Sequence, residues 1–364
     1  MGNKMKIAVL GSGNGGCVVA FDWAKHGHDV NLFDFERFPD NIRAIRTNGG
    51  IQAVGALEGF ASVSYAGHDL KQTLDGADII LVVGPAYSTR AFAEACKPYL
   101  RHGQTVIVLP GSCGGSIEFK NGAGLQVRDQ DIAVAETSTL PYGVRVLEPG
   151  KIRVHLKLKA GVLAAAVPAR DTTQVIEKIG KIYPSVKPAK NVLQTSLEND
   201  NPVIHPAITL LNVGLIERTA GNFLFYEEGV TPAVGRLIKA LDEERISIGR
   251  KLSIEIKPDP ETEVVQGYSK ETSYDRGFSE GPGFKGVKAP KTLDDRYFNE
   301  DVGYGLVFMH SLAEQIDVDT PCISSVIRLA SLVMNRDYLR EAKRTMKSLG
   351  LSGRTAKELE TMLA

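Results

Sequence analysis

One stretch near the start of the chain restricts the fold more than any other. The apolar run Ile7–Leu10 leads directly into a turn with the spacing G-x-G-x-x-G. Between a strand and a helix, this spacing is typical of a dinucleotide-binding Rossmann unit, because the helix N-terminus binds a pyrophosphate. A glycine-rich turn that only needs left-handed backbone angles is the alternative. The residues expected to contact the dinucleotide here are Gly11, Ser12, Gly13, Asn14, Gly15 and Gly16.

The sequence that follows this turn supports the Rossmann interpretation. A helix is expected over Cys17–Lys25, and a second strand, Asp29–Phe33, ends at Asp34. An acidic residue at this place accepts hydrogen bonds from the adenosine ribose, and its charge disfavours a 2′-phosphate. We therefore expect NAD, with NADP as the alternative because Arg37 and Arg43 are close in sequence. Both arginines are expected to be solvated helix residues.

Charge and cysteine content exclude several classes of protein. The 43 Lys and Arg residues balance the 43 Asp and Glu residues, so no overall charge favours nucleic acid or an anionic membrane. No apolar stretch reaches the about 20 residues that cross a bilayer, and the first strand begins too early for a signal peptide. The four cysteines lack the spacing of a zinc site, so we expect reduced thiols, no metal and a cytoplasmic enzyme.

The periodicity divides the chain into two parts. Strand and helix patterns alternate up to about residue 188, as in a parallel sheet covered by helices. Near the end of this part, Val144–Leu147, Arg153–Leu158 and Val162–Val167 are expected to form a meander of strands. From residue 189 onward, apolar residues recur at helical spacing. The predicted fold class is therefore α/β: a doubly wound Rossmann domain over 1–188, followed by an all-α domain over 189–364.

The carboxyl ends of the predicted strands indicate where a ligand binds, because ligands of open α/β sheets lie beyond these ends. After the strand Asp78–Val83, a Gly-Pro turn is expected to lie beside the glycine-rich turn and to contact the cofactor through Gly84 and Pro85. Backbone placement alone is the alternative for this pair. A third loop, Pro110–Gly115, is expected at the same edge.

The segment Pro258–Pro290 interrupts the helical pattern of the second part. It is rich in Gly, Pro, Ser, Lys and Glu. Such a segment is too long for an idle loop in a compact domain. We expect either a lid or a disordered excursion.

The segment Asn199–Pro206 contains the histidine with the most specific setting. Because proline suits the first turn of a helix, His205 is expected at or beside the N-cap of a helix that buries Ile208, Leu211 and Leu215. A histidine there needs a nearby carboxylate to titrate usefully at neutral pH. A capping or surface imidazole is the alternative. A further segment, 293–303, would by itself indicate a solvated turn.

Several motifs along the chain together resemble one enzyme family. They are the turn Val9–Gly16, Glu136–Ser138, Asn201–Pro206, Glu228–Pro232, Asp242–Ile246 and Arg296–Val302. The combination resembles the opine dehydrogenases, a family that includes octopine, nopaline and N-carboxyethyl-norvaline dehydrogenases. The resemblance spans nearly the entire chain. The His-Pro and R-Y-F-x-E-D-V motifs are its specific part, whereas the glycine run is unspecific.

The resemblance implies a reversible, NAD(P)H-dependent condensation of an amino acid with a 2-oxo acid, typically pyruvate, through an imine. It also implies that His205 and Asp301 are a catalytic pair and that Arg296 binds substrate. The chemistry agrees, since imine formation needs a group that moves protons near neutral pH. A guanidinium also suits a substrate carboxylate. Asn201, on the same turn as His205, is expected to orient the substrate, with helix capping as its alternative.

Two other functions stay open at this point. One is a 2-oxo-acid or ketone reductase of the hydroxyacid-dehydrogenase superfamily, and the other is a catalytically silent NAD-binding regulator. The lysine–asparagine spacing of the hydroxyacid-dehydrogenase superfamily occurs at Lys187–Asn191. Pro188, however, disfavours the helix on which such a pair would share one face. The expected partners are small molecules, an amino acid and a 2-oxo acid, without nucleic acid or membrane. A homodimer is left open.

Overall fold

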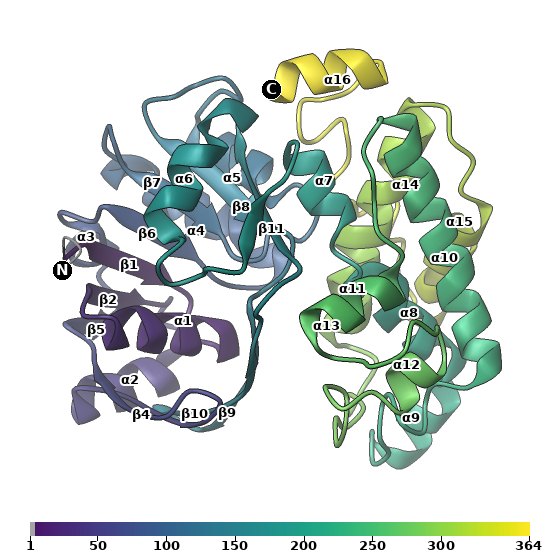
Figure 1. Cartoon of the computed structure of the whole chain (residues 1–364), viewed down its shortest axis with the longest axis horizontal. Coiled ribbons are helices and arrows are strands. Elements are labelled where there is room, and N and C mark those ends of the chain that lie inside the picture. Colours follow the sequence, from purple (N-terminus) through teal and green to yellow (C-terminus); the bar gives the residue numbers. More distant parts are fainter. Residues whose placement is uncertain (1–3) are drawn as a thin grey trace. The chain divides into compact units, whose positions relative to one another are not determined.

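The chain divides into two compact units in a computed structural model that describes residues 4–364 (Figure 1). One unit runs through Gly111, resumes at Gly115, continues to Val192 and takes in Met362–Ala364. The other contains Ser112–Gly114 and Leu193–Thr361. The three residues Ser112–Gly114 therefore leave the unit that surrounds them in sequence.

The first unit is built on an eight-stranded sheet with the order β12-β11-β8-β7-β6-β1-β2-β5. Neighbouring strands are parallel except β11, which is antiparallel to β8. The central strands β6 and β7 are buried throughout, as their apolar sequences predict. The strands are β1 (Lys6–Leu10), β2 (Asp29–Phe33), β5 (Tyr65–Gly67), β6 (Ile79–Val82), β7 (Thr105–Val108), β8 (Ala133–Thr137), β11 (Val162–Val167) and β12 (Val186–Pro188).

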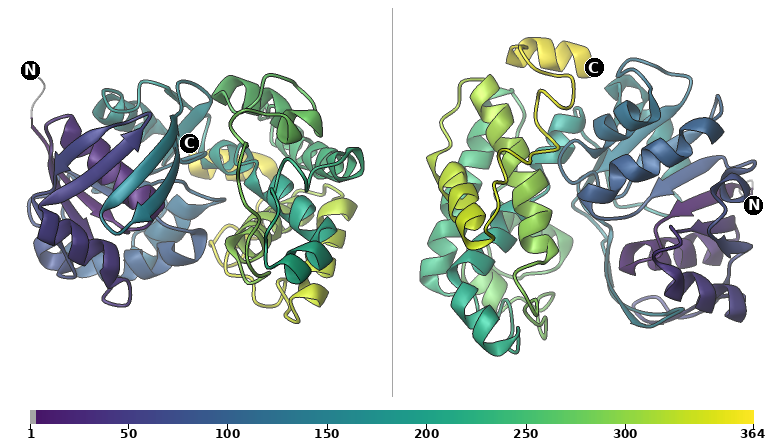
Figure 2. Two further views of the ribbon diagram at one scale, coloured as in Figure 1. Left: turned by 90° about the horizontal axis from the view of Figure 1, so that it is seen from below. Right: turned by 180° about the vertical axis from the view of Figure 1, so that it is seen from behind.

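Helices cover both faces of this sheet (Figures 1 and 2). On one face, helices α3, α4 and α5 share a core with the strands through Leu74, Phe92 and Phe119. On the other face, α1 packs between the main sheet and a second, smaller sheet. The doubly wound arrangement predicted from the sequence is confirmed. The helices are α1 (Asn14–Lys25), α2 (Pro39–Asn48), α3 (Leu70–Leu74), α4 (Thr89–Cys96), α5 (Gly115–Ala123) and α6 (Thr172–Ile179), with short 3-10 turns at Ala86–Ser88, Lys97–Tyr99 and Ala169–Asp171.

The smaller sheet has four strands in the order β4-β3-β10-β9. Its strands are β3 (Gly50–Gly55), β4 (Gly59–Ser62), β9 (Tyr142–Glu148) and β10 (Lys151–Lys157). The predicted meander is therefore wrong in its last strand, because β11 pairs with β8 of the main sheet rather than with β10. The reason lies in the sequence of β11, which is apolar at every position and suits a strand covered on both faces.

The second unit is helical apart from one isolated bridge between Leu224 and Lys288. This confirms the all-α prediction for the later part of the chain. Its helices, with those at its borders, are α7 (Val192–Leu197), α8 (Asn201–Leu211), α9 (Val213–Thr219), α10 (Pro232–Lys251), α11 (Asp259–Gln266), α12 (Arg276–Ser279), α13 (Arg296–Asn299), the π-helix η4 (Asp301–Leu306), α14 (Val307–Gln315), α15 (Pro321–Val333) and α16 (Ala356–Leu363).

The segment 258–290 is part of the packed structure of the second unit. It contains α11 and α12 and buries Phe278 and Phe284 against Tyr226. The expectation of a disordered excursion is therefore wrong, because these aromatic residues anchor a segment whose overall composition is polar. A lid role for the segment stays a prediction.

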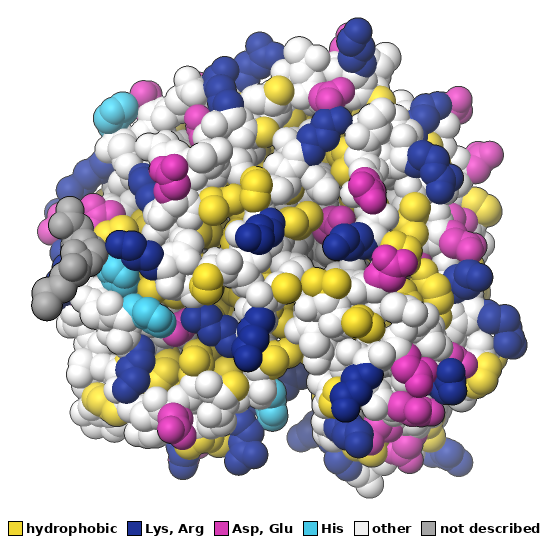
Figure 3. Space-filling view, in the orientation of Figure 1, with side chains coloured by type: hydrophobic (Ala, Val, Ile, Leu, Met, Phe, Trp, Pro, Cys, Tyr) yellow, Lys and Arg dark blue, Asp and Glu magenta, His cyan; other side chains and the backbone are white. Residues whose placement is uncertain are grey.

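The surface carries both signs of charge, as the balanced composition predicts. Lys and Arg side chains are interspersed with Asp and Glu side chains over the face shown in Figure 3. Within residues 4–364, no helix has the length and the apolar character to cross a membrane. All four cysteines are free thiols, and three of them are buried.

Candidate active site

The glycine-rich turn has the geometry that a dinucleotide needs. Gly11 has a φ of +109°, and a Cβ there would lie 2.0 Å from the Val83 carbonyl oxygen. A Cβ at Gly16 would lie 1.8 Å from the carbonyl oxygen of Gly11, so neither position accepts a side chain. At Gly13, by contrast, a Cβ would meet nothing within 4 Å. Helix α1 begins at Asn14, three residues earlier than predicted, and no side chain caps it. No side chain therefore occupies its first N–H groups, as anion binding requires.

Asp34 lies at the carboxyl end of β2 and is tied to the same turn. One carboxylate oxygen of Asp34 accepts hydrogen bonds from the N–H and the Oγ of Ser12, at 2.7 and 2.8 Å. The other oxygen accepts from the N–H of Phe35 at 2.8 Å. Ser12 thus orients the acidic side chain that is expected to bind the ribose. Arg37 and Arg43 are both exposed, as predicted, but only Arg43 lies in a helix. Arg37 belongs to the turn before α2 (Pro39–Asn48) and lies over the ring of Phe35.

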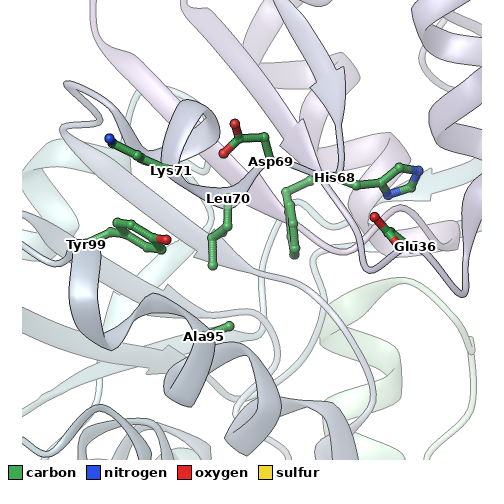
Figure 4. A pocket seen from close by; sticks show the side chains of 8 residues that line it. Glu36, His68, Asp69, Leu70, Lys71, Ala95 and Tyr99 are labelled. Atoms are coloured by element: carbon green, nitrogen blue, oxygen red, sulfur yellow. The ribbon is translucent and has the colours of Figure 1, made fainter.

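An open pocket of about 600 Å³ lies in the first unit, on the side where Asp34 follows strand β2 (Figure 4). Its lining includes His68, whose Nδ1 lies 2.7 Å from the backbone oxygen of Asp34. Glu36 and His68 lie together at one end of the pocket, with Tyr99, Leu70 and Ala95 further along it (Figure 4). None of the predicted catalytic residues lines this pocket. It lies on the side of the first unit where the sequence predicts the adenosine.

The Gly84-Pro85 turn is adjacent to the glycine-rich turn, as predicted. Val83 precedes it, donates its N–H to the Leu10 carbonyl and packs against Gly11. A Cβ at Gly84 would lie 2.4 Å from the Oγ of Ser88, so a larger residue here would require the Ser88 side chain to move. Contact of Gly84 and Pro85 with the cofactor stays a prediction.

Helix α8 carries His205, but not at its N-cap. The helix begins at Asn201, Asp200 is its N-cap, and Pro202 occupies the first turn. His205 therefore lies inside the helix, and the predicted N-cap position is wrong because Pro202, rather than Pro206, is the first-turn proline. The predicted buried face is confirmed at Ile208 but wrong at Leu211, which is half-exposed at the end of α8. It is also wrong at Leu215, which belongs to α9 and is only partly buried.

The His205 imidazole is held on both of its nitrogens. Its Nδ1 lies 2.7 Å from the Oδ2 of Asp301, and its Nε2 lies 3.0 Å from the hydroxyl of Tyr226. Tyr297 stacks on the imidazole with ring centroids 4.1 Å apart, and Phe225 in turn stacks on Tyr297 at 4.7 Å. All five side chains are buried. The orientation of the imidazole is thus fixed by hydrogen bonds and by stacking.

Asp301 reaches His205 because of an unusual helical segment. Asp301 opens the π-helix η4, in which the N–H of Gly305 bonds to the carbonyl of Glu300, five residues earlier. Single π-turns of this kind are frequent at functional sites. A Cβ at Gly305 would lie 2.4 Å from Pro202, so glycine here allows η4 to pack closely on the first turn of α8. This close approach brings the carboxylate to the imidazole.

Burial changes the acidity of the groups around His205. Burial raises the pKa of Asp301 from 3.8 to about 7, although Arg296 lowers it in part. Burial likewise raises the pKa of the Tyr226 phenol well above its usual value. The carboxyl group of Asp301 therefore exchanges its proton near neutral pH, the range in which an acid–base catalyst works, and it does so beside an imidazole.

Arg296 and Asn201 lie next to this pair. Arg296 is the first residue of α13, its guanidinium is half-exposed, and it forms an ion pair with Glu300 at 3.6 Å. It adjoins Tyr297 in sequence and lies 5.6 Å from the centre of that ring. Asn201, one turn before His205 on α8, is partly exposed. The second unit therefore brings together all four residues that the sequence predicted for catalysis and substrate binding.

Sequence reasoning missed the aromatic residues that position His205. Tyr297 was part of a recognised motif but had no role, and Phe225 and Tyr226 were not considered. The only available signal was that this pair directly precedes the Glu228–Pro232 motif. A second missed feature is the loop after β7, where Ser112 and Cys113 have φ values of +46° and +68°. Such angles are strained for residues other than glycine and cluster at functional sites.

A second group of ionisable residues lies at the start of α8. Carboxylate oxygens of Asp200, Asp259 and Glu263 lie within 4.8 Å of one another, and all three residues are buried. Arg245, which is bound to Asp242, lowers the pKa of Asp200 and Asp259 in part. Burial raises the pKa of Asp200 to about 6 and raises the pKa values of Asp259 and Glu263 well above normal. This group therefore holds protons near neutral pH.

Two protein-family models and several individual proteins match this chain. Residues 188–334 match a family described as NAD/NADP octopine/nopaline dehydrogenase, alpha-helical domain. Residues 6–112 match the N-terminus of NAD-dependent glycerol-3-phosphate dehydrogenase. An opine dehydrogenase of Arthrobacter sp. (strain 1C) is 35% identical over 356 residues, which cover 96% of each chain. The ocs protein of Agrobacterium vitis is 30% identical over 363 residues, covering 96% of this chain and 97% of that one.

Solved structures show the same fold. An octopine dehydrogenase in complex with NADH and agmatine has a TM-score of 0.80 at 18% identity, with 98% of both chains covered. Yersinopine dehydrogenase with bound NADP⁺ has a TM-score of 0.72 at 16% identity, covering 100% of this chain and 98% of that one.

Proposed function

Because the chain belongs to the opine dehydrogenase family, we propose that His205, Asp301 and Arg296 perform the reaction of this family on substrates held by the helical unit. The reaction is the NAD(P)H-dependent reductive condensation of an amino acid with a 2-oxo acid. Pyruvate is the proposed oxo acid, since one of the solved octopine dehydrogenase structures contains pyruvate with NADH. The observation that carries the proposal is the buried contact between His205 and Asp301.

The condensation requires a group that both accepts and returns a proton. The ammonium group of the amino acid must lose a proton before its nitrogen attacks the carbonyl carbon, and the resulting hydroxyl must gain a proton to leave as water. His205 suits this task because Asp301 stabilises its charged form and holds the ring in place. One proton taken up and returned leaves the imidazole ready for the next turnover.

Arg296 is proposed to bind the carboxylate of the oxo acid. Its guanidinium is half-exposed, so it is available to a substrate, and Glu300 restrains its position through an ion pair. A guanidinium binds a carboxylate through two parallel hydrogen bonds, which fixes the orientation of the carbonyl group as well as its position. Asn201 is proposed to orient the amino acid from the same turn of α8.

The first unit fits a nicotinamide dinucleotide. The open space at Gly13, the uncapped N-terminus of α1 and the buried Asp34 are the features that such a ligand requires. When bound, the reduced cofactor supplies the hydride that converts the imine to a secondary amine. Gly11–Gly16 would hold the pyrophosphate and Asp34 the adenosine ribose.

The alternative of a simple 2-oxo-acid reductase is less well supported by the structure. The lysine–asparagine pair of that superfamily needs one helix face, but Lys187 and Pro188 belong to strand β12. The sequence argument against this motif is confirmed.

The proposed function is tested by NADH oxidation with pyruvate, in parallel reactions with and without each of the amino acids. Oxidation that depends on one group of amino acids is expected, together with a secondary-amine product whose mass equals the sum of both substrates minus one oxygen atom. Oxidation by pyruvate alone, yielding a hydroxy acid, would instead indicate the reductase. A silent regulator would bind NADH without oxidising it under any combination of substrates.

A further inference from the structure

The hydroxyl of Tyr226 is hydrogen-bonded to Nε2 of His205, the nitrogen that Asp301 leaves available for proton exchange with a substrate. With Asp301 ionised, the Nδ1–H of His205 donates to the carboxylate at 2.7 Å. The remaining nitrogen, Nε2, lies 3.0 Å from the Tyr226 hydroxyl. We propose that Tyr226 is a catalytic residue that relays protons between His205 Nε2 and the substrate, so that the acid–base unit is a Tyr–His–Asp chain. This inference rests on the proposed function.

Packing opposes the simpler arrangement in which Tyr226 moves aside for the substrate. The Tyr226 ring lies edge-on to Phe225 at 5.0 Å between ring centroids and contacts Phe284 at 4.5 Å. Only 6% of its surface is exposed. The imidazole cannot turn away either, because Tyr297 stacks on it and Asp301 holds Nδ1. Displacing the phenol would therefore break a buried hydrogen bond and disturb an aromatic cluster.

The substrate-binding residue proposed above is close enough to act on the same phenol. Arg296 is one of the charged groups that influence Tyr226, together with Glu263 and the phenols of Tyr297 and Tyr268. In this proposal, an oxo acid whose carboxylate is bound by Arg296 places its carbonyl oxygen beside the Tyr226 hydroxyl, which serves as its proton donor.

The relay takes up and returns one proton during the condensation. When the substrate ammonium gives a proton to the Tyr226 oxygen, the phenol proton passes to His205 Nε2. The free amine then forms a bond to the carbonyl carbon as the π bond of the carbonyl breaks, and a proton moves from the nitrogen to the resulting alkoxide. When the C–O bond of the resulting carbinolamine breaks, the phenol proton goes to the leaving hydroxyl, which departs as water. The imidazolium then returns its proton to the phenol oxygen. No net proton is consumed before hydride transfer.

Burial of Tyr226 determines how the two proton transfers are coupled. Since burial raises the pKa of this phenol well above its usual value, a free phenolate is unfavourable. Each proton must therefore reach the oxygen as the other leaves it. This is consistent with one direct contact to Nε2 and not with an isolated tyrosine base.

The experiment compares Tyr226→Phe with two other variants under saturating NADH. Tyr226→Phe keeps the ring and removes only the hydroxyl, and it should lower kcat by about 100-fold or more, the usual loss for an acid–base group. The pH–rate profile should also change. Tyr274→Phe is the matched control, since it removes a tyrosine hydroxyl bonded to Asp242 in the same unit; its kcat and profile should resemble those of the unmodified enzyme. His205→Asn reports on the proposed function itself.

The outcomes separate the relay from the wider proposal. An inactive His205→Asn enzyme beside a Tyr226→Phe enzyme with near-normal kcat would overturn the relay alone. An active His205→Asn enzyme would overturn the proposed function. If Tyr226→Phe lost stability, 3-fluorotyrosine at position 226 would replace it, because this residue keeps the hydroxyl and changes only its acidity. The pH–rate profile of the 3-fluorotyrosine enzyme should shift to lower pH, and an unchanged profile would contradict the relay.

Discussion

The carboxylate of Asp301 and the imidazole of His205 meet at 2.7 Å in the buried interior of the helical unit, although 96 residues separate them in sequence. Neither group has bulk water to stabilise its charge, so each depends on the other. The ionised carboxylate favours the protonated imidazole, and the imidazole N–H favours the ionised carboxylate. The acid–base behaviour of the enzyme should therefore belong to the pair.

Replacing Asp301 by Asn tests this dependence. Asn keeps the size of the side chain but removes the charge that stabilises the imidazolium, so kcat should fall by about 10-fold to 1,000-fold, less than for loss of His205. The acidic limb of the kcat/KM profile should move to lower pH, because loss of the carboxylate lowers the pKa of the imidazole. Rates measured from pH 5 to 9 would show this. An unchanged profile would mean that Asp301 does not act on His205 in turnover.

Asp34 should determine the choice of cofactor. Its buried carboxylate lies at the end of β2, where a ribose 2′-phosphate would meet a negative charge. We expect a higher kcat/KM with NADH than with NADPH, and a smaller preference in Asp34→Ser. Arg37→Ala is the informative companion variant, because Arg37 is exposed and close in sequence. Equal or better use of NADPH by the unmodified enzyme, together with a loss of this activity in Arg37→Ala, would contradict the assignment.

Arg296→Lys should affect the oxo acid selectively. Lysine keeps the positive charge but cannot bind a carboxylate through two parallel hydrogen bonds. The KM for the oxo acid should rise about 10-fold or more, whereas the KM for NADH should stay unchanged. Arg328→Lys, at an exposed position of α15, is a suitable control. The role of Arg296 would be refuted by steady-state data in which both KM values match those of the unmodified enzyme.

The sequence predicted the members of this site but not their arrangement. His205, Asp301 and Arg296 were identified because they lie in specific motifs, yet no local pattern shows that residues 96 positions apart share a hydrogen bond. Two prolines in one segment made the start of α8 ambiguous, and Pro206 was chosen where Pro202 opens the helix. The π-turn at Asp301 depends on packing against Pro202, which is a tertiary effect.

The Rossmann unit was easier to predict, because its signals are local. The strand Asp29–Phe33 was located at its exact bounds, and the turn between β1 and α1 has a fixed spacing. The error concerned β11, where the choice between two sheets depends on partners far away in sequence. The position of Tyr226 shortly before the Glu228–Pro232 motif does not predict its role, since a single tyrosine before a turn is compatible with many environments.

The buried carboxyl groups of Asp200, Asp259 and Glu263 should make stability depend on pH. Because their pKa values are raised in the folded protein, folding takes up protons, and this contribution to stability is lost as the pH rises from about 4 through 6 and above. Asp259→Asn removes one of these charges, so its free energy of unfolding should exceed that of the unmodified protein at pH 8 by about 1–3 kcal/mol.

Urea unfolding at pH 5 and pH 8 would measure this difference. Glu261→Gln is the control, since Glu261 lies on the same helix α11 but is exposed. It should leave the pH dependence unchanged. If Asp259→Asn were less stable than the unmodified protein at pH 8, the carboxylate would be a needed partner in the folded state and the interpretation would fail.

The kcat of His205→Asn tests the central claim most directly. Asparagine can still bond to Asp301 but cannot take up a proton, so kcat for the condensation should fall by about 100-fold to 10,000-fold. NADH affinity, measured by fluorescence titration, should stay the same, because the expected dinucleotide contacts lie at Gly11–Gly16 and Asp34. A folded His205→Asn enzyme that condenses its amino acid and oxo acid at a near-normal rate would show that the His205–Asp301 pair is structural and that the proton is moved by another group.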